Sequence, residues 1–319
     1  MSKLRFGIMG AGGIAGHFVR ATRLADAAEV VAVASKSIER AEMFAKENKI
    51  ASFCTYDELL ARDDIEAVYV ATTHNFHYEN IKKCLESGKH VLCEKAMVLT
   101  EKDAAELFAL AESKGLFLME AMWTRFLPSM QKARKWITDG KIGKIQSVSG
   151  VIGFKGKDDV NCRLLNPDLA GGALYDIGVY VIEVASFLVG EKIVDAYGKV
   201  RRDARTGVDS NVSFVVEFVT VDACLQCMIT ANPKEYMIIN GDKGYIEIPR
   251  SHVNNECFLY DNERNLTDHF KKEFVGGNGF VYEIEEVAQC IRNGKTQSEI
   301  MPAAATLECA RVFEKLLNN

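Results

Sequence analysis

The chain has 319 residues, of which 48% are hydrophobic and 26% are charged, a balance that excludes a disordered or fibrous protein. Its 39 Lys and Arg against 44 Asp and Glu leave a net charge of −5, so nucleic acid is not an expected partner. Nine cysteines, an odd number spread along a long chain, do not resemble the disulfide framework of a small secreted domain. We therefore expect reduced thiols, a cytoplasmic location and, at about 150 residues per domain, two domains.

Neither a membrane span nor a cysteine-based metal site is predicted. The apolar run at 179–189 is broken by Glu183, and no other run approaches the roughly 18 residues that span a bilayer. Only Cys224 and Cys227 have the C-x-x-C spacing, and in a strand these two side chains would point to opposite faces.

The first 120 residues or so alternate short apolar runs with segments of helical period, the pattern of a parallel sheet covered by helices on both faces. This rhythm predicts a doubly wound α/β domain. The expected strands are Leu4–Met9, Val30–Ala34, Ala67–Ala71, His90–Cys93 and Leu116–Met119, and the expected helices are Ile14–Leu24, Ile38–Glu47, His77–Ser87 and Glu101–Ser113.

The pattern changes after residue 122, where strands begin to follow one another without intervening helices. Such an order predicts an α+β domain with an open, mostly antiparallel sheet, so we divide the chain into residues 1–122 and 123–319. The expected helices are Ser129–Thr138, a long helix starting near Asp168, Val281–Arg292 and Ala303–Leu317, and the expected strands are 145–154, 193–202, 210–221, 223–230, 235–240, 244–249 and 257–261.

A glycine-rich turn follows the first strand. Gly10 and Gly12 lack side chains, so the backbone there can turn tightly and approach a pyrophosphate. The helix that follows adds free N–H groups and a partial positive charge. With the flanking strand and helix in place, the motif predicts a dinucleotide site formed by Gly10, Gly12, Gly13, Ile14 and Ala15.

The end of the second strand indicates which dinucleotide binds. An NAD site usually has an acid there for the adenosine ribose, but this chain has Ser35, Lys36 and Ser37, with Arg40 one turn later. Two cations and two hydroxyls can bind a 2′-phosphate through charge-assisted hydrogen bonds. The sequence favours NADP(H), with NAD(H) and two solvated cations as the alternative.

Three separated motifs resemble a known family. They are LRFGIMGAGGIA at the start, GKHVLCEK at 88–95 and GGALYDIGVY at 171–180. In this order they resemble the glucose-fructose oxidoreductase and inositol dehydrogenase family, called Gfo/Idh/MocA. The residues EAMWTRF at 120–126, Arg163 before Asn166-Pro167, and Tyr180 resemble its branch of NADP-dependent trans-dihydrodiol dehydrogenases and D-xylose 1-dehydrogenases.

The resemblance implies a Rossmann domain followed by an open-sheet domain through which members form dimers or tetramers. The sequence adds an argument of its own, because an apolar strand face made of Val212, Phe214, Val216 and Phe218 needs a cover. We therefore expect a homo-oligomer assembled through the C-terminal sheet.

The resemblance also assigns Lys95 to the family's E-K-P position. This lysine follows a buried strand at the edge of the sheet where doubly wound folds bind ligands. Here Ala96 replaces the proline, which removes a rigid ring from the loop that carries Lys95. For an isolated lysine we would favour a strand cap paired with Glu94.

Asp176 and Tyr180 are four residues apart on a predicted helix, so both project from one face. Most of the family has histidine at position 180, and the dihydrodiol branch has tyrosine. A tyrosine pKa of about 10 is too high for base catalysis at neutral pH, but the Lys95 ammonium would lower it. The hypothesis is that Tyr180, assisted by Lys95, removes the proton of a substrate hydroxyl while hydride leaves for the nicotinamide. Asp176 would orient the substrate hydroxyls or Lys95.

Further residues are assigned to binding by their place near these motifs. For the aromatic residues, core packing explains the pattern equally well. Two histidines without an acid-rich partner set do not indicate a metal site. The remaining cofactor candidates are Thr72, His74, Asn75, His77, Glu94, Lys95, Trp123 and Arg125, and the substrate candidates are Trp123, Phe154, Arg163, Asp176 and Tyr180.

Three functions fit these residues. The first is an NADP-dependent oxidoreductase acting on a small-molecule diol or on an aldose such as D-xylose. The second is a non-catalytic NAD(P)-binding regulatory protein of the same fold, and the third is an inositol or other sugar dehydrogenase that uses NAD. The presence of both Lys95 and Tyr180 favours an enzyme.

Overall fold

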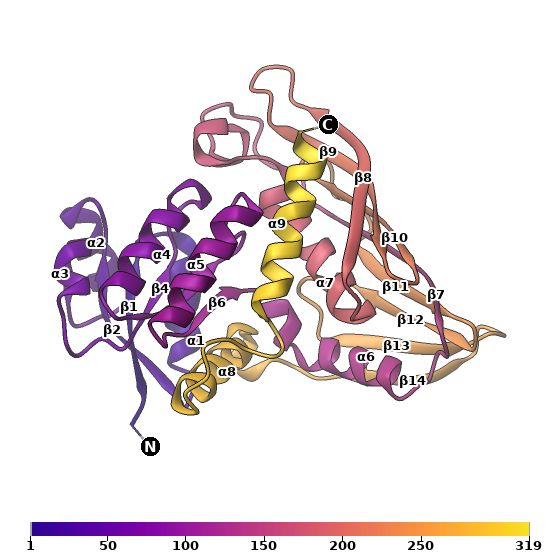
Figure 1. The fold of residues 1–319 in the computed structure, drawn as a ribbon, viewed down its shortest axis with the longest axis horizontal. Helices are drawn as coiled ribbons and strands as arrows, with labels where there is room; N and C mark the ends of the chain where they lie inside the picture. Colours follow the sequence, from indigo (N-terminus) through magenta and orange to yellow (C-terminus); the bar gives the residue numbers. More distant parts are fainter. Residues whose placement is uncertain (1, 319) are drawn as a thin grey trace. The chain divides into compact units, whose positions relative to one another are not determined.

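The computed structural model describes residues 2–318, which divide into two compact units (Figure 1). The first unit contains the residues up to Val98, Lys102–Trp123 and Phe274–Thr306. The second contains Leu99–Glu101, Thr124–Glu273 and the residues from Leu307 onward. Residues 274–306, which follow the last strand, therefore group with the N-terminal part of the chain. The division into domains 1–122 and 123–319 stays a prediction.

The first unit is built on a six-stranded sheet with the order β3-β2-β1-β4-β5-β6. Every neighbouring pair is parallel, as the apolar runs predicted. This is the Rossmann order, in which the chain reverses direction across the sheet between β1 and β4 and ligands bind at the carboxyl ends of the strands. The strands are β1 Leu4–Met9, β2 Ala28–Ala34, β3 Phe53–Cys54, β4 Ala67–Val70, β5 His90–Glu94 and β6 Leu118–Ala121.

The helices of this unit agree with the predicted segments. Two elements were not predicted, β3 and α3, because two and five residues are too short to show a period. A capping box nevertheless marks the start of α3, where Thr55 and Glu58 bond to each other's backbone N–H. The helices are α1 Gly13–Thr22, α2 Ile38–Glu47, α3 Tyr56–Leu60, α4 His77–Glu86, α5 Glu101–Ser113 and α8 Phe280–Arg292.

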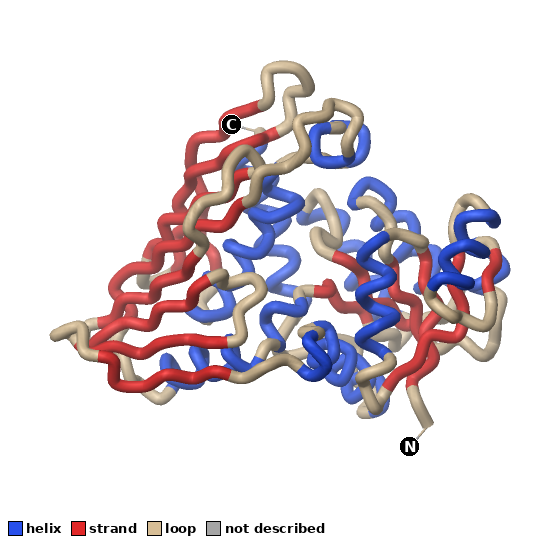
Figure 2. Tube along the Cα trace, turned by 180° about the vertical axis from the view of Figure 1, so that it is seen from behind, coloured by secondary structure: helices blue, strands red, loops and turns tan. Residues whose placement is uncertain are grey.

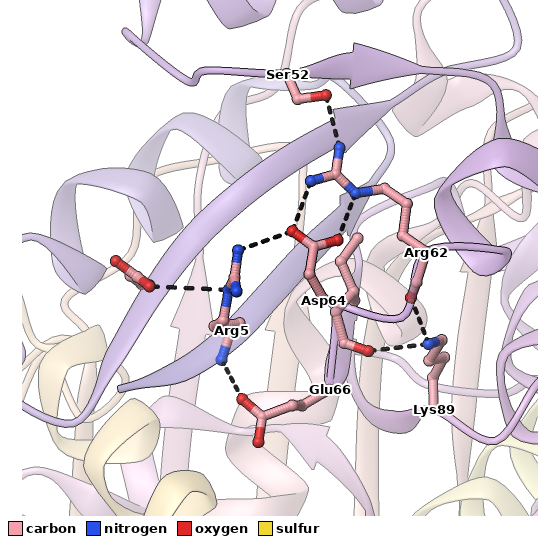
Figure 3. A network of polar contacts seen from close by, with 8 residues as sticks. Arg5, Ser52, Arg62, Asp64, Glu66 and Lys89 are labelled. Carbon is pink, nitrogen blue, oxygen red and sulfur yellow. Dashed lines mark hydrogen bonds and ion pairs between the residues drawn. The ribbon is translucent and has the colours of Figure 1, made fainter. Parts of the chain in front are cut away.

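A network of hydrogen bonds and ion pairs links residues at the amino ends of these strands, at the edge of the sheet opposite the expected ligand site (Figure 3). Arg5 and Arg62 both donate to Asp64. The nearly buried Lys89 ammonium donates to the carbonyl oxygens of Arg62 at 2.7 Å and Ile65 at 2.9 Å. The network therefore stabilises the fold and leaves the carboxyl edge to ligands.

Replacing Lys89 with methionine is expected to lower the free energy of unfolding by about 1–3 kcal/mol, because two carbonyl oxygens lose their donor. Urea titration measures this change. The exposed Lys83 on α4, changed to methionine, is the matched control and is expected to have little effect. Equal losses for the two variants would show that the Lys89 contacts contribute nothing specific.

The second unit contains an eight-stranded sheet with the order β14-β13-β12-β11-β7-β10-β9-β8. Only β7 and β10 pair in parallel, so the prediction of a mostly antiparallel sheet is confirmed. The polar strand β14 was not predicted, because it lacks an alternating apolar face. The strands are β7 Ile145–Gly153, β8 Ile193–Arg202, β9 Asp209–Phe218, β10 Asp222–Met228, β11 Tyr236–Gly241, β12 Gly244–Pro249, β13 Glu256–Asp261 and β14 Leu266–Lys271.

One face of this sheet is covered by helices of the same unit (Figure 2). Helix α7, Val179–Val189, packs on β7, β10 and β11, while α6, Pro128–Thr138, packs on β13 and β14. The apolar face of β9, from Val212 to Phe218, lies on the covered side and is at most 5% exposed. This face needs no second copy of the chain to cover it, so the expectation that its apolar residues require an oligomer is wrong. Assembly through the sheet stays a prediction that would use its other face.

The long helix predicted to start near Asp168 is wrong in its first part. A 3₁₀ turn at Pro167–Leu169 and a π-helical turn at Leu174–Gly178 precede α7. Segment Pro167–Val189 is long and apolar enough to cross a membrane, but 83% of its apolar window is buried in the structure, as in the core helix of a globular protein. The chain closes with α9, Ala303–Leu317, as predicted.

Candidate functional site

The glycine turn joins β1 to α1. Gly10 has a φ of +113°, and a Cβ there would come within 2.6 Å of the Ala71 carbonyl oxygen, so only glycine fits beside the end of β4. A Cβ at Gly12 or Gly13 would meet nothing within 4 Å. The first glycine is thus required by packing, and the next two face open space.

The start of α1 fits an anionic group. Gly12 is the N-cap residue, no side chain caps the helix, and its first turn contains no acid. The backbone N–H groups of that turn are therefore available to a ligand. An open turn without side chains, leading into an uncapped helix N-terminus, fits the pyrophosphate of a dinucleotide. Ile14 and Ala15 lie in the first turn of α1.

The end of β2 carries the cations that the sequence singled out. The Lys36 ammonium lies 3.6 Å from the centroid of the Phe76 ring, and Arg40 is exposed in the first turn of α2. Ser37 caps α2 by accepting from the Arg40 N–H at 3.3 Å, and its hydroxyl donates to Glu39. That hydrogen bond lowers the pKa of the Glu39 carboxyl, so an ionised acid stands near the two cations. Ser35 is buried at the strand end.

The loop after β4 holds the backbone of the loop that carries Lys95. His74 Nε2 lies 3.1 Å from the Lys95 carbonyl oxygen. His77 is wholly buried, with Nδ1 2.9 Å from the Ala96 oxygen and Nε2 3.0 Å from the Thr72 oxygen. Burial lowers the pKa of His77. Both histidines therefore hold the backbone of the Lys95 loop, in which Ala96 stands where the family has proline.

The neighbouring polar residues of this loop support one another. The Thr73 hydroxyl donates to Asn75 Oδ1 at 2.7 Å, and Asn80 donates to the Thr72 hydroxyl at 3.1 Å. Thr72 and Asn75 are both half-buried at the carboxyl edge of the sheet.

Within residues 2–318, no three His, Cys, Asp or Glu side chains are grouped to hold a metal ion.

Glu94 and Lys95 end β5 at the same edge. The Tyr69 hydroxyl donates to the buried Glu94 carboxylate. Glu283, which the sequence analysis missed, is wholly buried nearby, and its burial together with the charge of Glu94 holds its pKa well above the usual range. Lys95 is half-buried, and its peptide bond to Ala96 is cis. Two acidic side chains, Glu94 and Glu283, are thus buried close to each other, and Lys95 directly follows the first of them.

Trp123 belongs to an aromatic cluster in the first unit. Its ring centroid lies 5.1 Å from that of Phe280 and 6.5 Å from that of Phe274. The side chain is only half-buried, so it can both pack and contact a ligand. Its role in binding stays a prediction.

Arg125, in the second unit, forms a buried ion pair. Its guanidinium lies 2.5 Å from the Glu183 carboxylate, and the two side chains are 4% and 1% exposed. The ring of Phe187 lies 5.4 Å from the guanidinium carbon. The sequence showed Glu183 only as a break in an apolar run and could not show that Arg125 is its partner.

Three substrate candidates of the second unit, Phe154, Arg163 and Asp176, lie just after β7 and on the turns before α7. Arg163 Nη2 lies 2.5 Å from Asp176 Oδ1, so the structure brings these two predicted residues together. Asp176 sits in the π-helical turn, which is held at its start by Asp209 accepting from the Leu174 N–H at 2.7 Å. Burial raises the pKa of Asp209 to about 6. Phe154 is half-buried directly after β7.

Tyr180 lies in the first turn of α7 and is 8% exposed. Its ring centroid is 5.5 Å from that of His252, a residue that the sequence analysis missed. Lys95 and Tyr180 belong to different units, so their pairing stays a prediction.

Comparison with known proteins identifies the family. Residues 4–122 match the model of an oxidoreductase family with an NAD-binding Rossmann fold, and residues 130–247 match the Gfo/Idh/MocA C-terminal domain. A trans-1,2-dihydrobenzene-1,2-diol dehydrogenase from Mus musculus is 32% identical over 98% of this chain and 95% of its own length. The chain belongs to the Gfo/Idh/MocA family. The human protein of the same name is 30% identical over 98% of this chain and 96% of its own.

Solved structures agree with this assignment. A 3-ketoreductase from Actinomadura kijaniata, in complex with NADP and TDP-benzene, has a TM-score of 0.85 at 26% identity, over 99% of this chain and 97% of that chain. An aldose-aldose oxidoreductase from Caulobacter crescentus has a TM-score of 0.87 at 24% identity, over 98% and 96%, and shares the fold. The chain is therefore an oxidoreductase with a Rossmann domain for NAD(P), as the sequence predicted.

Proposed function

We propose that this protein is an NADP-dependent dehydrogenase that oxidises a secondary hydroxyl of a vicinal diol or of an aldose such as D-xylose. The observation that carries the proposal is similarity over 98% of the chain to enzymes that oxidise a trans-dihydrodiol. Tyr180, Lys95 and Asp176 supply the groups that this chemistry requires.

Some of the candidate site residues transfer the proton, and others bind the substrate. Bound nicotinamide supplies the acceptor for the hydride. Tyr180, as the phenolate, accepts the proton of the substrate hydroxyl, and the Lys95 ammonium stabilises that phenolate. Asp176, already fixed by Arg163, orients a neighbouring hydroxyl of the diol. Trp123 and Phe154 form apolar walls for the ring or sugar face.

The cofactor preference rests on the end of β2. Lys36 and Arg40 are both exposed there and can bind a 2′-phosphate. Glu39 supports the competing function, an NAD-dependent inositol or sugar dehydrogenase, because a carboxylate near this strand end can accept hydrogen bonds from the adenosine ribose. Two cations against one acid favour NADP.

Replacing Lys36 and Arg40 together with alanine is expected to weaken NADPH binding about 10–100-fold, because two charge-assisted hydrogen bonds are lost, and to leave NADH binding almost unchanged. Fluorescence titration with each cofactor measures both affinities. Lys46→Ala, in the last turn of α2, is the control. Equal loss of NADPH and NADH affinity would contradict a phosphate site at this position.

The activity is tested with wild-type protein and NADP+ against dihydrodiols, aldoses and inositols, with absorbance at 340 nm as the signal. Reduction with a diol or an aldose supports the proposal. Tight NADPH binding without turnover on any of them would favour a non-catalytic regulatory protein of the same fold.

A cytoplasmic location and a dimer or tetramer formed through the eight-stranded sheet are further parts of the proposal.

A further inference from the structure

His252 lies next to Tyr180, and Glu235 lies next to His252, although both residues are far from Tyr180 in the sequence. The rings of Tyr180 and His252 are tilted at 53° with their centroids 5.5 Å apart. The Nδ1 atom of the same histidine lies 3.7 Å from Glu235 Oε2. Tyrosine, histidine and carboxylate thus follow one another within the second unit.

The histidine and the glutamate are more exposed than the tyrosine. Tyr180 is 8% exposed, whereas the side chains of Glu235 and His252 are 15% and 18% exposed. A proton taken up by Tyr180 would reach bulk water more readily from the more exposed His252 than from the tyrosine itself. Because histidine changes its charge near neutral pH, its ring is suited to pass that proton on.

The structure fixes His252 in place. The wholly buried Thr124 hydroxyl donates to the His252 carbonyl oxygen at 2.8 Å, and the buried Ser129 hydroxyl donates to the Asn254 oxygen at 3.0 Å. The loop between β12 and β13 is therefore anchored at His252 itself and two residues after it, so the position of the imidazole beside Tyr180 is defined.

Glu235 is held in the same way. Its Oε1 accepts from the Gly153 N–H at 3.1 Å, which leaves Oε2 directed towards His252. Burial raises the pKa of Glu235, and the charge of Arg250 acts in the opposite direction. The titratable groups that face the imidazole are thus Tyr180 on α7 and Glu235 before β11. The charge of Arg250 acts on Glu235.

We propose that His252, oriented by Glu235, relays the proton that Tyr180 takes from the substrate to solvent. During alcohol oxidation the substrate O–H proton moves to the Tyr180 phenolate, and the carbon-bound hydrogen leaves as hydride to NADP+. The Tyr180 hydroxyl then gives its proton, directly or through one water, to the Nε2 atom of His252, which releases it to solvent. One carbonyl, one NADPH and one proton result, and Tyr180 returns to the phenolate. The relay rests on the proposed function of Tyr180.

His252→Ala tests the relay. The variant is expected to lower kcat by about 10²-fold with little change in KM, because a group that transfers a proton is lost while the substrate contacts remain. Added imidazole is expected to restore part of the rate, with a pH dependence that follows the added base. A merely structural role of His252 would not respond to imidazole.

His269→Ala is the matched control, because His269 also faces a glutamate in the same unit, with its Nε2 3.2 Å from Glu256. This variant is expected to keep the wild-type rate and to ignore imidazole. Glu235→Gln keeps the shape of the side chain and is expected to lower kcat less than His252→Ala does. If His252→Ala does not fold, His252→Gln is measured in its place with the same readouts.

The relay is overturned if the folded His252 variant keeps the wild-type kcat and pH profile, or loses rate without any response to imidazole. If Tyr180→Phe is inactive at the same time, the proposed function stands and only the relay fails. If the wild-type protein reduces NADP+ with none of the diols and sugars, the proposed function itself fails.

Discussion

Replacing Tyr180 with phenylalanine is expected to lower kcat by about 10²–10⁴-fold, because the variant keeps the ring but has no group to accept the substrate proton. NADPH affinity should stay at the wild-type value, since the cofactor turn belongs to the other unit. Steady-state rates at saturating NADP+ and a fluorescence titration with NADPH measure the two quantities separately.

Tyr175→Phe provides the control for this change. Tyr175 lies in the π-helical turn one turn before Tyr180, and its ring packs 5.1 Å from that of Phe313. Removing its hydroxyl is expected to keep the wild-type kcat. A Tyr180→Phe protein that turned over at the wild-type rate would assign the proton transfer to another residue.

Replacing Arg125 with alanine is expected to lower the free energy of unfolding by about 3–5 kcal/mol, because the buried Glu183 carboxylate loses its partner. Urea titration measures the loss. Arg205→Ala is the surface control, since Arg205 is about half exposed beside Asp158 and Asp203, and such pairs contribute about 0–1 kcal/mol.

The double variant Arg125→Met with Glu183→Leu separates stability from binding. Apolar side chains in place of a buried ion pair are expected to recover most of the lost stability. A stable double variant that binds NADPH normally would make Arg125 a structural residue. A stable double variant that no longer binds cofactor or substrate would confirm the contact that the sequence predicted. Equal losses for Arg125→Ala and Arg205→Ala would contradict the buried pair.

Most helices and strands could be predicted from local patterns in the sequence. The strand Leu4–Met9 and the helix Ile38–Glu47 were predicted to the residue, because each shows the local pattern of its element. The strand is a short apolar run, and the helix buries residues three and four apart, Ala41, Phe44 and Ala45. The glycine turn could also be predicted, because the strand before it and the helix after it are its neighbours in sequence. The packing on the Ala71 carbonyl oxygen that requires Gly10 was not visible in the sequence. The π-helical turn at Leu174–Gly178 could not, because the 3.6-residue and wider periods differ little over five residues.

Contacts between distant segments were out of reach. Alternation showed that one face of β9 is apolar but not that the fold buries this face. The pairing of Arg125 with Glu183 joins residues 58 positions apart, and His252 meets Tyr180 across 72 positions. His74 and His77 were expected near the cofactor, and the structure shows that they hold the backbone of the Lys95 loop. Each of these depends on tertiary packing that one sequence does not display.

A pre-steady-state measurement tests the central claim most directly. Wild-type protein is saturated with NADP+, mixed rapidly with an excess of the best diol or aldose and followed at 340 nm. We expect about one NADPH per subunit in a fast phase with wild-type protein, and a phase slowed by about 10²-fold or more with Tyr180→Phe. A wild-type protein that binds NADP+ but forms no NADPH with any diol or aldose, or a Tyr180→Phe variant as fast as wild type, would contradict the account.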